Sequence, residues 1–173
     1  MADGISARLD TTGWDRGLDQ LSDFLRERLA RSMAVAGGQV LRDEAKARAP
    51  VGTAEGGSIT PGLLRSAIYL AYSPERSTDG KQVYVVSWNS EKARHGHLLE
   101  FGHWLTHVAY RGPDGEWYSN PDKPLAQPKW VAAEPFLRPA LDAAIGRARD
   151  AMIVRGRQRL FDLLAGQTED IEA

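Results

Sequence analysis

Apolar residues recur every three to five positions over two long stretches of the chain, which predicts two long helices. The first stretch covers residues 18–49, and Pro50 is expected to end it because proline cannot donate the next helical hydrogen bond. The second covers residues 137–165, with Pro139 in its first turn, where a missing N–H costs nothing. Gly166 follows the last periodic residue and is expected to end this helix.

Two adjacent glycines, Gly37 and Gly38, interrupt the first helical pattern near its middle. Each costs about 1 kcal/mol of helix stability relative to alanine. We therefore expect either a bend at this point or the close approach of another part of the chain.

Three segments are typical of strands. Residues 4–11 alternate apolar and polar positions, which indicates a short, half-buried strand. Residues 68–72 and 82–88 read as an antiparallel pair, and Asp79-Gly80 between them is suited to a turn. Both faces of 82–88 are apolar or aromatic, so we expect this strand to lie centrally in its sheet.

Short helices are expected on either side of the strand pair. Residues 63–67 can form a single helical turn, and residues 91–101 a short helix capped by Ser90 and ended by Gly102.

Residues 103–133 are expected to form a hairpin that leaves the main fold. The turn signal Gly112-Pro113-Asp114-Gly115 separates two strand-like segments, 104–110 and 116–118. Three prolines then discourage regular structure until a last strand over 129–133, and they are Pro121, Pro124 and Pro128.

These elements predict an α+β fold, with a small antiparallel sheet of about four to five strands packed by the N-terminal and C-terminal helices. A length of 173 residues is typical of one domain, so we expect a single domain over 1–173. Residues 103–133 would be an inserted excursion, and residues 166–173 a flexible acidic tail.

Composition excludes several classes of protein. The formal net charge of −1 and a pI near 6.4 lack the basic footprint of a nucleic-acid-binding domain. There are no cysteines, which excludes disulfides, thiolate metal sites and cysteine nucleophiles. Neither a membrane span nor a signal peptide is expected, because no apolar run is long enough and the first residues lack a signal peptide's charged start. We therefore expect a soluble intracellular protein.

The four histidines lie close together in the sequence, at 95, 97, 103 and 107, with Glu100 among them. Imidazole and carboxylate are ordinary zinc ligands, but the spacing matches no H-E-x-x-H site. On a strand, His103 and His107 would stand about 13 Å apart, too far to share one ion. We expect no metal site and no cofactor, and exposed or interfacial histidines instead.

No catalytic set is evident either. No serine lies in a G-x-S-x-G turn, and no phosphate-binding G-x-x-x-x-G-K-[ST] sequence is present. Glu100 could act as a general base, but it lacks a partner at suitable spacing. The preferred interpretation is that Glu100 caps a helix or bridges to an arginine.

Candidate partner contacts fall in two regions and at one arginine. Residues 50–62 form a long loop of breakers and small polar residues, and Trp104, Trp117 and Trp130 lie in an excursion with little core of its own. A compact subdomain could also bury these tryptophans. Arg155 belongs to an arginine-rich helix that suits either solvent or an interface. The candidate contact residues are Thr53, Glu55, Gly56, Gly57, Trp104, Trp117, Trp130 and Arg155.

An ordered set of short motifs goes beyond composition. Ala47-Arg48-Ala49-Pro50 ends the first helix, and Gly62-Leu63-Leu64-Arg65-Ser66-Ala67-Ile68 follows. After the strand pair come His97-Leu98-Leu99-Glu100-Phe101-Gly102 and then Pro135-Phe136-Leu137-Arg138-Pro139-Ala140-Leu141. In this order the motifs resemble the tail-completion proteins (head–tail joining, or neck, proteins) of long-tailed bacteriophages. The motif residues that carry structure are Pro50, Leu64, Ser66, Glu100, Gly102, Pro135, Phe136 and Pro139.

The resemblance implies a structural, non-enzymatic component of the virion, assembled in the host cytoplasm. It implies a ring, of six copies, between the head connector or stopper protein and the tail tube or terminator protein. DNA would pass through the ring without sequence-specific binding. The alternatives are a tail terminator that caps the tube and, from another class, a histidine-dependent metal hydrolase.

Two further expectations concern the ring. The purified chain is expected to stay monomeric until it meets its docking surface, because a joining protein must not assemble early. Residues 50–62 carry one charge, Glu55, so this loop could line a channel without gripping phosphate, although a plain connector fits equally well.

Overall fold

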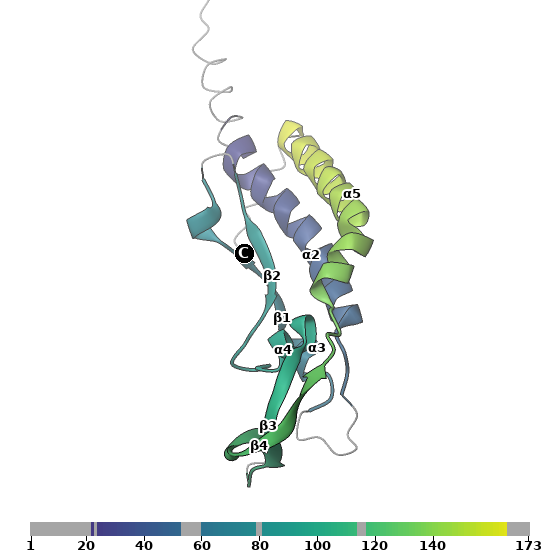
Figure 1. The fold of residues 1–173 in the computed structure, drawn as a ribbon. Coiled ribbons are helices and arrows are strands. Elements are labelled where there is room, and N and C mark those ends of the chain that lie inside the picture. The colour runs from purple at the N-terminus through teal and green to yellow at the C-terminus, as the bar shows by residue number, and fades with distance from the viewer. Residues whose placement is uncertain (1–21, 23, 53–59, 79–80, 114–116, 166–173) are drawn as a thin grey trace, which may run out of the picture.

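Two long helices lie side by side and antiparallel along one side of the molecule (Figure 1). The computed structural model describes residues 22, 24–52, 60–78, 81–113 and 117–165. A π-helical segment, η1 (Phe24–Leu29), runs into α2 (Ala30–Arg48), and α5 (Leu137–Leu164) returns beside it. Both helices are confirmed within the described residues.

Glycines allow α2 to approach its neighbours closely. A Cβ atom on Gly37 would lie 2.7 Å from Met152 Cγ and 3.2 Å from the carbonyl oxygen of Ala148, both on α5. In the same way, a Cβ atom on Gly156 of α5 would lie 2.8 Å from Sδ of Met33 on α2. Each methionine therefore fills the space that a glycine leaves on the opposite helix. The expected close approach at the glycine pair is confirmed.

A two-stranded antiparallel sheet packs against α2, which contacts both of its strands. The helical turn α3 (Leu63–Ala67) leads into β1 (Ile68–Tyr72), which pairs with β2 (Tyr84–Trp88) from Ile68↔Trp88 to Tyr72↔Tyr84. The short 3-10 helix η2 (Pro74–Arg76) lies in the connection. The predicted helical turn and strand pair are confirmed, although β2 begins at Tyr84.

A second two-stranded sheet forms a long hairpin, which projects beyond the end of α2 and the start of α5 (Figure 1). Strand β3 (His103–Arg111) pairs antiparallel with β4 (Trp117–Val131), which confirms the predicted hairpin. The prediction that prolines would break regular structure is wrong. Each strand of a two-stranded sheet has a free edge, where a residue without an N–H is tolerated. Pro124 pairs with His107, between two irregularities of register.

The expected single sheet of four to five strands is also wrong for the described residues. They form two separate sheets of two strands each, so β2 is an edge strand and not a central one. Among the described residues, β1 and β2 pair only with each other, and so do β3 and β4. The strand expected over 4–11 lies outside the described residues.

The short helix between the sheets begins later than predicted. α4 spans Gly96–Phe101, and Ser90 does not cap it. The N-cap residue of α4 is His95, which makes no side-chain capping bond. Nearer the predicted start, Asn89 Oδ1 accepts hydrogen bonds from the N–H groups of Glu91 (2.9 Å) and Lys92 (3.1 Å). These bonds stabilise a turn before α4.

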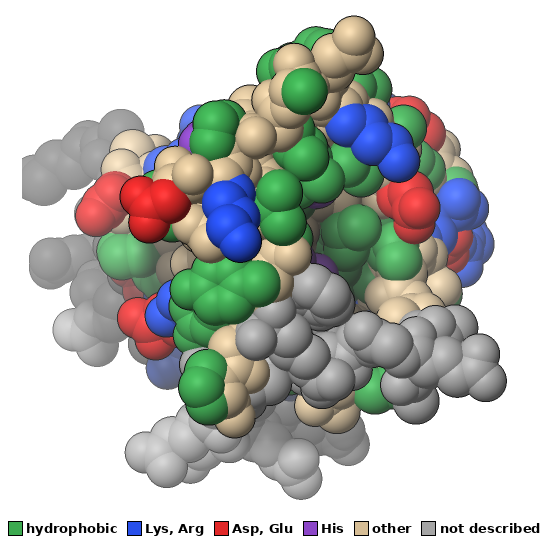
Figure 2. Space-filling model, turned by 60° about the horizontal axis from the view of Figure 1, so that its bottom comes forward, with side chains coloured by type: hydrophobic (Ala, Val, Ile, Leu, Met, Phe, Trp, Pro, Cys, Tyr) green, Lys and Arg blue, Asp and Glu red, His purple; other side chains and the backbone are tan. Residues whose placement is uncertain are grey.

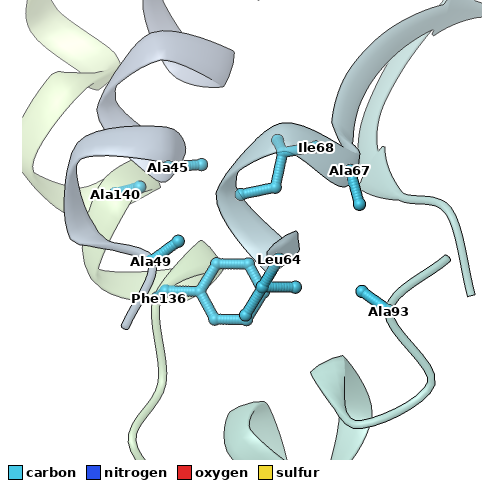
Figure 3. Packing of buried hydrophobic residues seen from close by; sticks show 8 residues of the cluster. All are labelled: Ala45, Ala49, Leu64, Ala67, Ile68, Ala93, Phe136 and Ala140. Carbon is cyan, nitrogen blue, oxygen red and sulfur yellow. The ribbon is translucent and has the colours of Figure 1, made fainter. Parts of the chain in front are cut away.

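The core lies where the helices, α3 and β1 meet (Figure 3). Phe136, Leu64 and Ile68 are its largest fully buried side chains, and the other members are alanines. The ring of Trp88 meets that of Phe136 edge-on, with centroids 5.8 Å apart. Within the described ranges, no helix is both long and apolar enough to cross a membrane.

Candidate functional site

The β3–β4 hairpin, residues 103–131, carries two exposed cross-strand aromatic pairs. Trp104 pairs with Trp130 near its base, and the indole rings meet edge-on with centroids 5.3 Å apart. Although they touch, the two residues remain 60% and 48% exposed. Near the tip Tyr110 pairs with Tyr118, with ring centroids 5.9 Å apart. The two pairs are separated along β3 by about 20 Å.

These aromatic residues belong to one continuous exposed face. Successive side chains of a strand point to opposite sides, so Trp104, Thr106, Val108 and Tyr110 share one side of β3. All four are exposed, whereas, of the alternate residues, His103, Leu105 and His107 are half-buried and Ala109, near the tip, is exposed.

Viewed from the hairpin end, apolar side chains spread over the surface with single charged side chains between them (Figure 2). Large aromatic side chains that gather exposed on a projecting hairpin favour a protein contact. We call the side of the hairpin that carries the two aromatic pairs the aromatic face. Its members are Trp104, Thr106, Val108, Tyr110, Tyr118 and Trp130.

Glu100, at the end of α4, anchors the hairpin to the rest of the fold. Its side chain is buried, and its carboxylate accepts three backbone hydrogen bonds at the start of α5. Oε2 accepts from the N–H groups of Phe136 (2.8 Å) and Leu137 (3.0 Å), and Oε1 from that of Arg138 (3.4 Å). Phe136 stands at the N-cap position and has no polar side chain to do this. A negative charge here also interacts favourably with the helix dipole.

Glu100 therefore caps a helix, one of the two roles expected for it. The sequence could not show which helix, because its target lies 36 residues further along the chain.

Gly102 forms the turn from α4 into the hairpin. Its φ of 70° and ψ of 173° lie in a region that only glycine adopts readily. A Cβ atom here would lie 2.7 Å from Trp130 Cζ2 and 2.8 Å from the carbonyl oxygen of Val131. Next to it, the N–H of Glu134 donates to the carbonyl oxygen of Leu99 at 2.7 Å. The start of β3 and the end of β4 are thus held together at one point.

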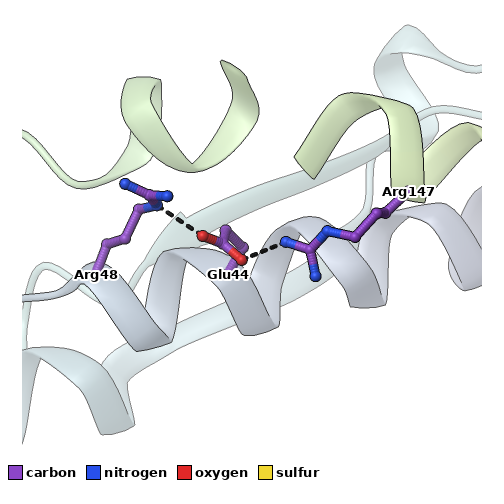
Figure 4. A network of polar contacts seen from close by, with 3 residues as sticks. All are labelled: Glu44, Arg48 and Arg147. Carbon is purple, nitrogen blue, oxygen red and sulfur yellow. Dashed lines mark hydrogen bonds and ion pairs between the residues drawn. The ribbon is translucent and has the colours of Figure 1, made fainter. Parts of the chain in front are cut away.

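A charged network joins α2 to α5 on the surface (Figure 4). The Glu44 carboxylate accepts from Arg147 of α5 and, at 2.7 Å, from Nε of Arg48 on its own helix. The hydrogen bond from Arg147, and then that from Arg48, hold the pKa of Glu44 below its ordinary value.

We expect the stabilising effect of Glu44 to disappear in acid. Its pKa is lower in the folded chain than in the unfolded one, so the stabilisation is complete above the ordinary pKa and is lost as the pH falls through the folded value. A Glu44→Gln variant should therefore be less stable than the wild type at pH 7, and the gap should narrow at pH 3. Urea unfolding at both pH values measures this. In a chain that also carries Arg147→Gln, the stability difference caused by Glu44→Gln should depend less on pH. An unchanged pH dependence would show that Arg147 does not lower the pKa of Glu44.

Of the remaining candidate contact residues, Arg155 lies apart from the two exposed aromatic pairs. Arg155 is half-buried and donates from Nε to Ser32 Oγ at 2.9 Å, which ties α5 to α2. Trp117 begins β4 opposite Arg111. The loop candidates lie outside the described residues, and they are Thr53, Glu55, Gly56 and Gly57.

The remaining motif residues hold the scaffold. Leu64 and Phe136 are buried in the core, and Ser66 Oγ donates to the carbonyl oxygen of Leu63. Pro50 follows the end of α2, Pro135 precedes α5, and Pro139 is the third residue of α5.

Sequence reasoning missed three apolar members of the aromatic face, Val108, Tyr110 and Tyr118. The alternation of residues 104–110 could have placed Val108 and Tyr110 beside Trp104.

The histidines do not form a metal centre within the part of the chain that the structure describes. No three His, Asp or Glu side chains gather there in a way that could hold an ion. His103 and His107 lie on the same side of β3, and Nδ1 of His107 is 2.9 Å from Thr106 Oγ1.

Comparison with known protein families gives a match over the first part of the chain. The model of the HK97-gp10-like family, described as tail components of bacteriophages, matches residues 15–102. The matched region includes α2, the β1–β2 sheet and α4, and it ends at Gly102, directly before the hairpin. No curated protein and no solved structure is significantly similar to the chain.

Proposed function

Because the match spans more than half of its length, the chain belongs to the HK97-gp10-like family of bacteriophage tail components, and we propose that it acts in the phage neck, joining the head connector to the tail tube. The family makes it a structural protein of the virion tail. The observation that carries the neck role is the hairpin with its exposed aromatic pairs, anchored at its base by Glu100 and Gly102. A joining protein needs such a projecting and firmly held contact surface.

We propose further that the protein works as a ring, of six copies. Copies in a ring meet through two different faces of the same subunit, and the aromatic face supplies one of these. The subunits would remain monomeric until the head connector or stopper protein, or the tail tube or terminator protein, holds them side by side.

DNA would pass through the lumen of this ring. With a net charge of −1, the chain has no general excess of positive charge with which to hold phosphate by counterion release. Residues 50–62 remain our candidate for the channel wall. Together with the aromatic face and Arg155, they form the proposed set of contacts.

Deletion of the gene from its phage tests the neck role directly. We expect filled heads and separate tails of normal length, because a missing joint leaves both parts intact. Electron microscopy of the lysate distinguishes these products, and complementation with the wild-type chain should restore joined particles. Tails of abnormal length would instead identify a tail terminator. Joined, infectious particles without the protein would overturn both roles, and metal analysis with a phosphodiesterase assay would then test the hydrolase.

A further inference from the structure

Helix α5 exposes a second apolar surface that no other described residue of the chain covers. Its small residues Ala140, Ala144, Ala148 and Gly156 are buried. Five large apolar residues are exposed on an adjacent flank, at intervals of four, eight, seven and four positions, and we call them the α5 stripe: Leu141, Ile145, Ile153, Leu160 and Leu164. Such intervals keep side chains on one side of a helix. Apolar residues on two sides are typical of a helix that is covered on both.

The charge of α5 limits what can cover the stripe. Residues 137–165 contain six arginines and three aspartates, a net charge of +3. Arg149 is exposed and lies four residues from both Ile145 and Ile153, so it interrupts the stripe itself. Two α5 helices packed stripe to stripe would bring two such charges together, which is unfavourable.

The aromatic face has the complementary properties. Residues 103–133 contain three basic and three acidic side chains, so the hairpin is neutral when its histidines are uncharged. Aromatic rings accept both aliphatic side chains and a guanidinium group. This chain already contains such a contact, because the guanidinium of Arg31 lies over the ring of Tyr72, 5.0 Å from its centroid.

One chain cannot bring its two surfaces together. The hairpin and α5 leave their junction at residues 132–136 in opposite directions (Figure 1). We propose that the aromatic face of one copy packs on the α5 stripe of the next copy. This inference rests on the ring proposed above and names its two faces.

The sizes of the surfaces fit such a contact and explain why it would be weak alone. The stripe is about 35 Å long, and the aromatic row on β3 about 20 Å. A two-stranded ribbon roughly 10 Å wide covers only about 200–300 Å² per partner over that length, well below the ~800 Å² of a stable interface. Copies would therefore pair only where a docking surface already holds them side by side.

Engineered cysteines test this pairing inside the phage particle. The natural chain has no cysteine, so every disulfide formed is the engineered one. We would introduce Ile153→Cys together with Trp104→Cys, Val108→Cys or Tyr110→Cys in turn; all four sites are exposed. Purified virions would be oxidised and run on a non-reducing gel. A ladder of dimers and higher multimers is expected for at least one pair.

The matched control combines the same hairpin cysteines with Gln39→Cys, an exposed site on α2, and should give no ladder. If the protein is present in the neck but none of the three pairs forms a ladder, this inference is wrong and the neck role stands. Dimers from Ile153→Cys alone would also overturn it, since they require α5 to meet α5. Absence of the protein from virions that assemble normally would overturn the proposed function itself.

Discussion

Replacing Glu100 with alanine is expected to lower the free energy of unfolding by about 3–5 kcal/mol, because three backbone N–H groups at the start of α5 lose their acceptor. An exposed helix cap is worth only about 0.5–2 kcal/mol. The larger effect follows from the burial of Glu100, which leaves little water to replace the carboxylate. Urea unfolding followed by circular dichroism measures the difference.

Glu134→Ala provides the matched control. Glu134 lies next to the same junction, but it is exposed, so its loss should change stability by no more than about 0.5 kcal/mol. Glu100→Gln should fall between the two, because an amide oxygen can still accept but carries no charge. Equal effects of the two alanine variants would show that the three hydrogen bonds contribute little.

The local elements could largely be predicted from the sequence, because local rules determine them. Helical periodicity predicted α2 and α5, and alternation with a turn signal predicted the β1–β2 pair and the β3–β4 hairpin. The glycine pair predicted either a bend or a close neighbour, and the structure shows close neighbours, Met152 of α5 and Leu70 of β1.

How the elements combine could not be predicted in the same way. Strand pairing depends on partners distant in sequence, so the number of strands in each sheet was overestimated. The prolines of β4 were misread because their tolerance depends on a free sheet edge, which is a tertiary property. For Glu100 the sequence indicated only that it caps a helix or bridges to an arginine. Its partners, the N–H groups of residues 136–138, lie too far along the chain to be identified from the sequence.

The candidate site, too, could be predicted from the sequence only in part. Sequence reasoning selected Trp104 and Trp130 because a protruding hairpin has little core, and the structure places both at exposed positions. Their role in subunit contact stays a prediction. The α5 stripe could not be predicted, because apolar residues at helical spacing indicate a helix but not which of its sides is covered, and only the packing of α2 shows that.

Two glycine substitutions should change stability in opposite directions, and their contrast tests how firmly the hairpin base is held. Gly102→Ala is expected to cost about 2–4 kcal/mol, since alanine is strained at this φ and its Cβ would meet Trp130 and the backbone of Val131. Gly146→Ala, in the middle of α5 with no atom within 4 Å of the new Cβ, should stabilise the chain by about 0.5–1 kcal/mol. Thermal and urea unfolding measure both. A Gly102→Ala variant as stable as the wild type would mean that the turn can relax, and the hairpin would then not be held in a fixed direction by its base.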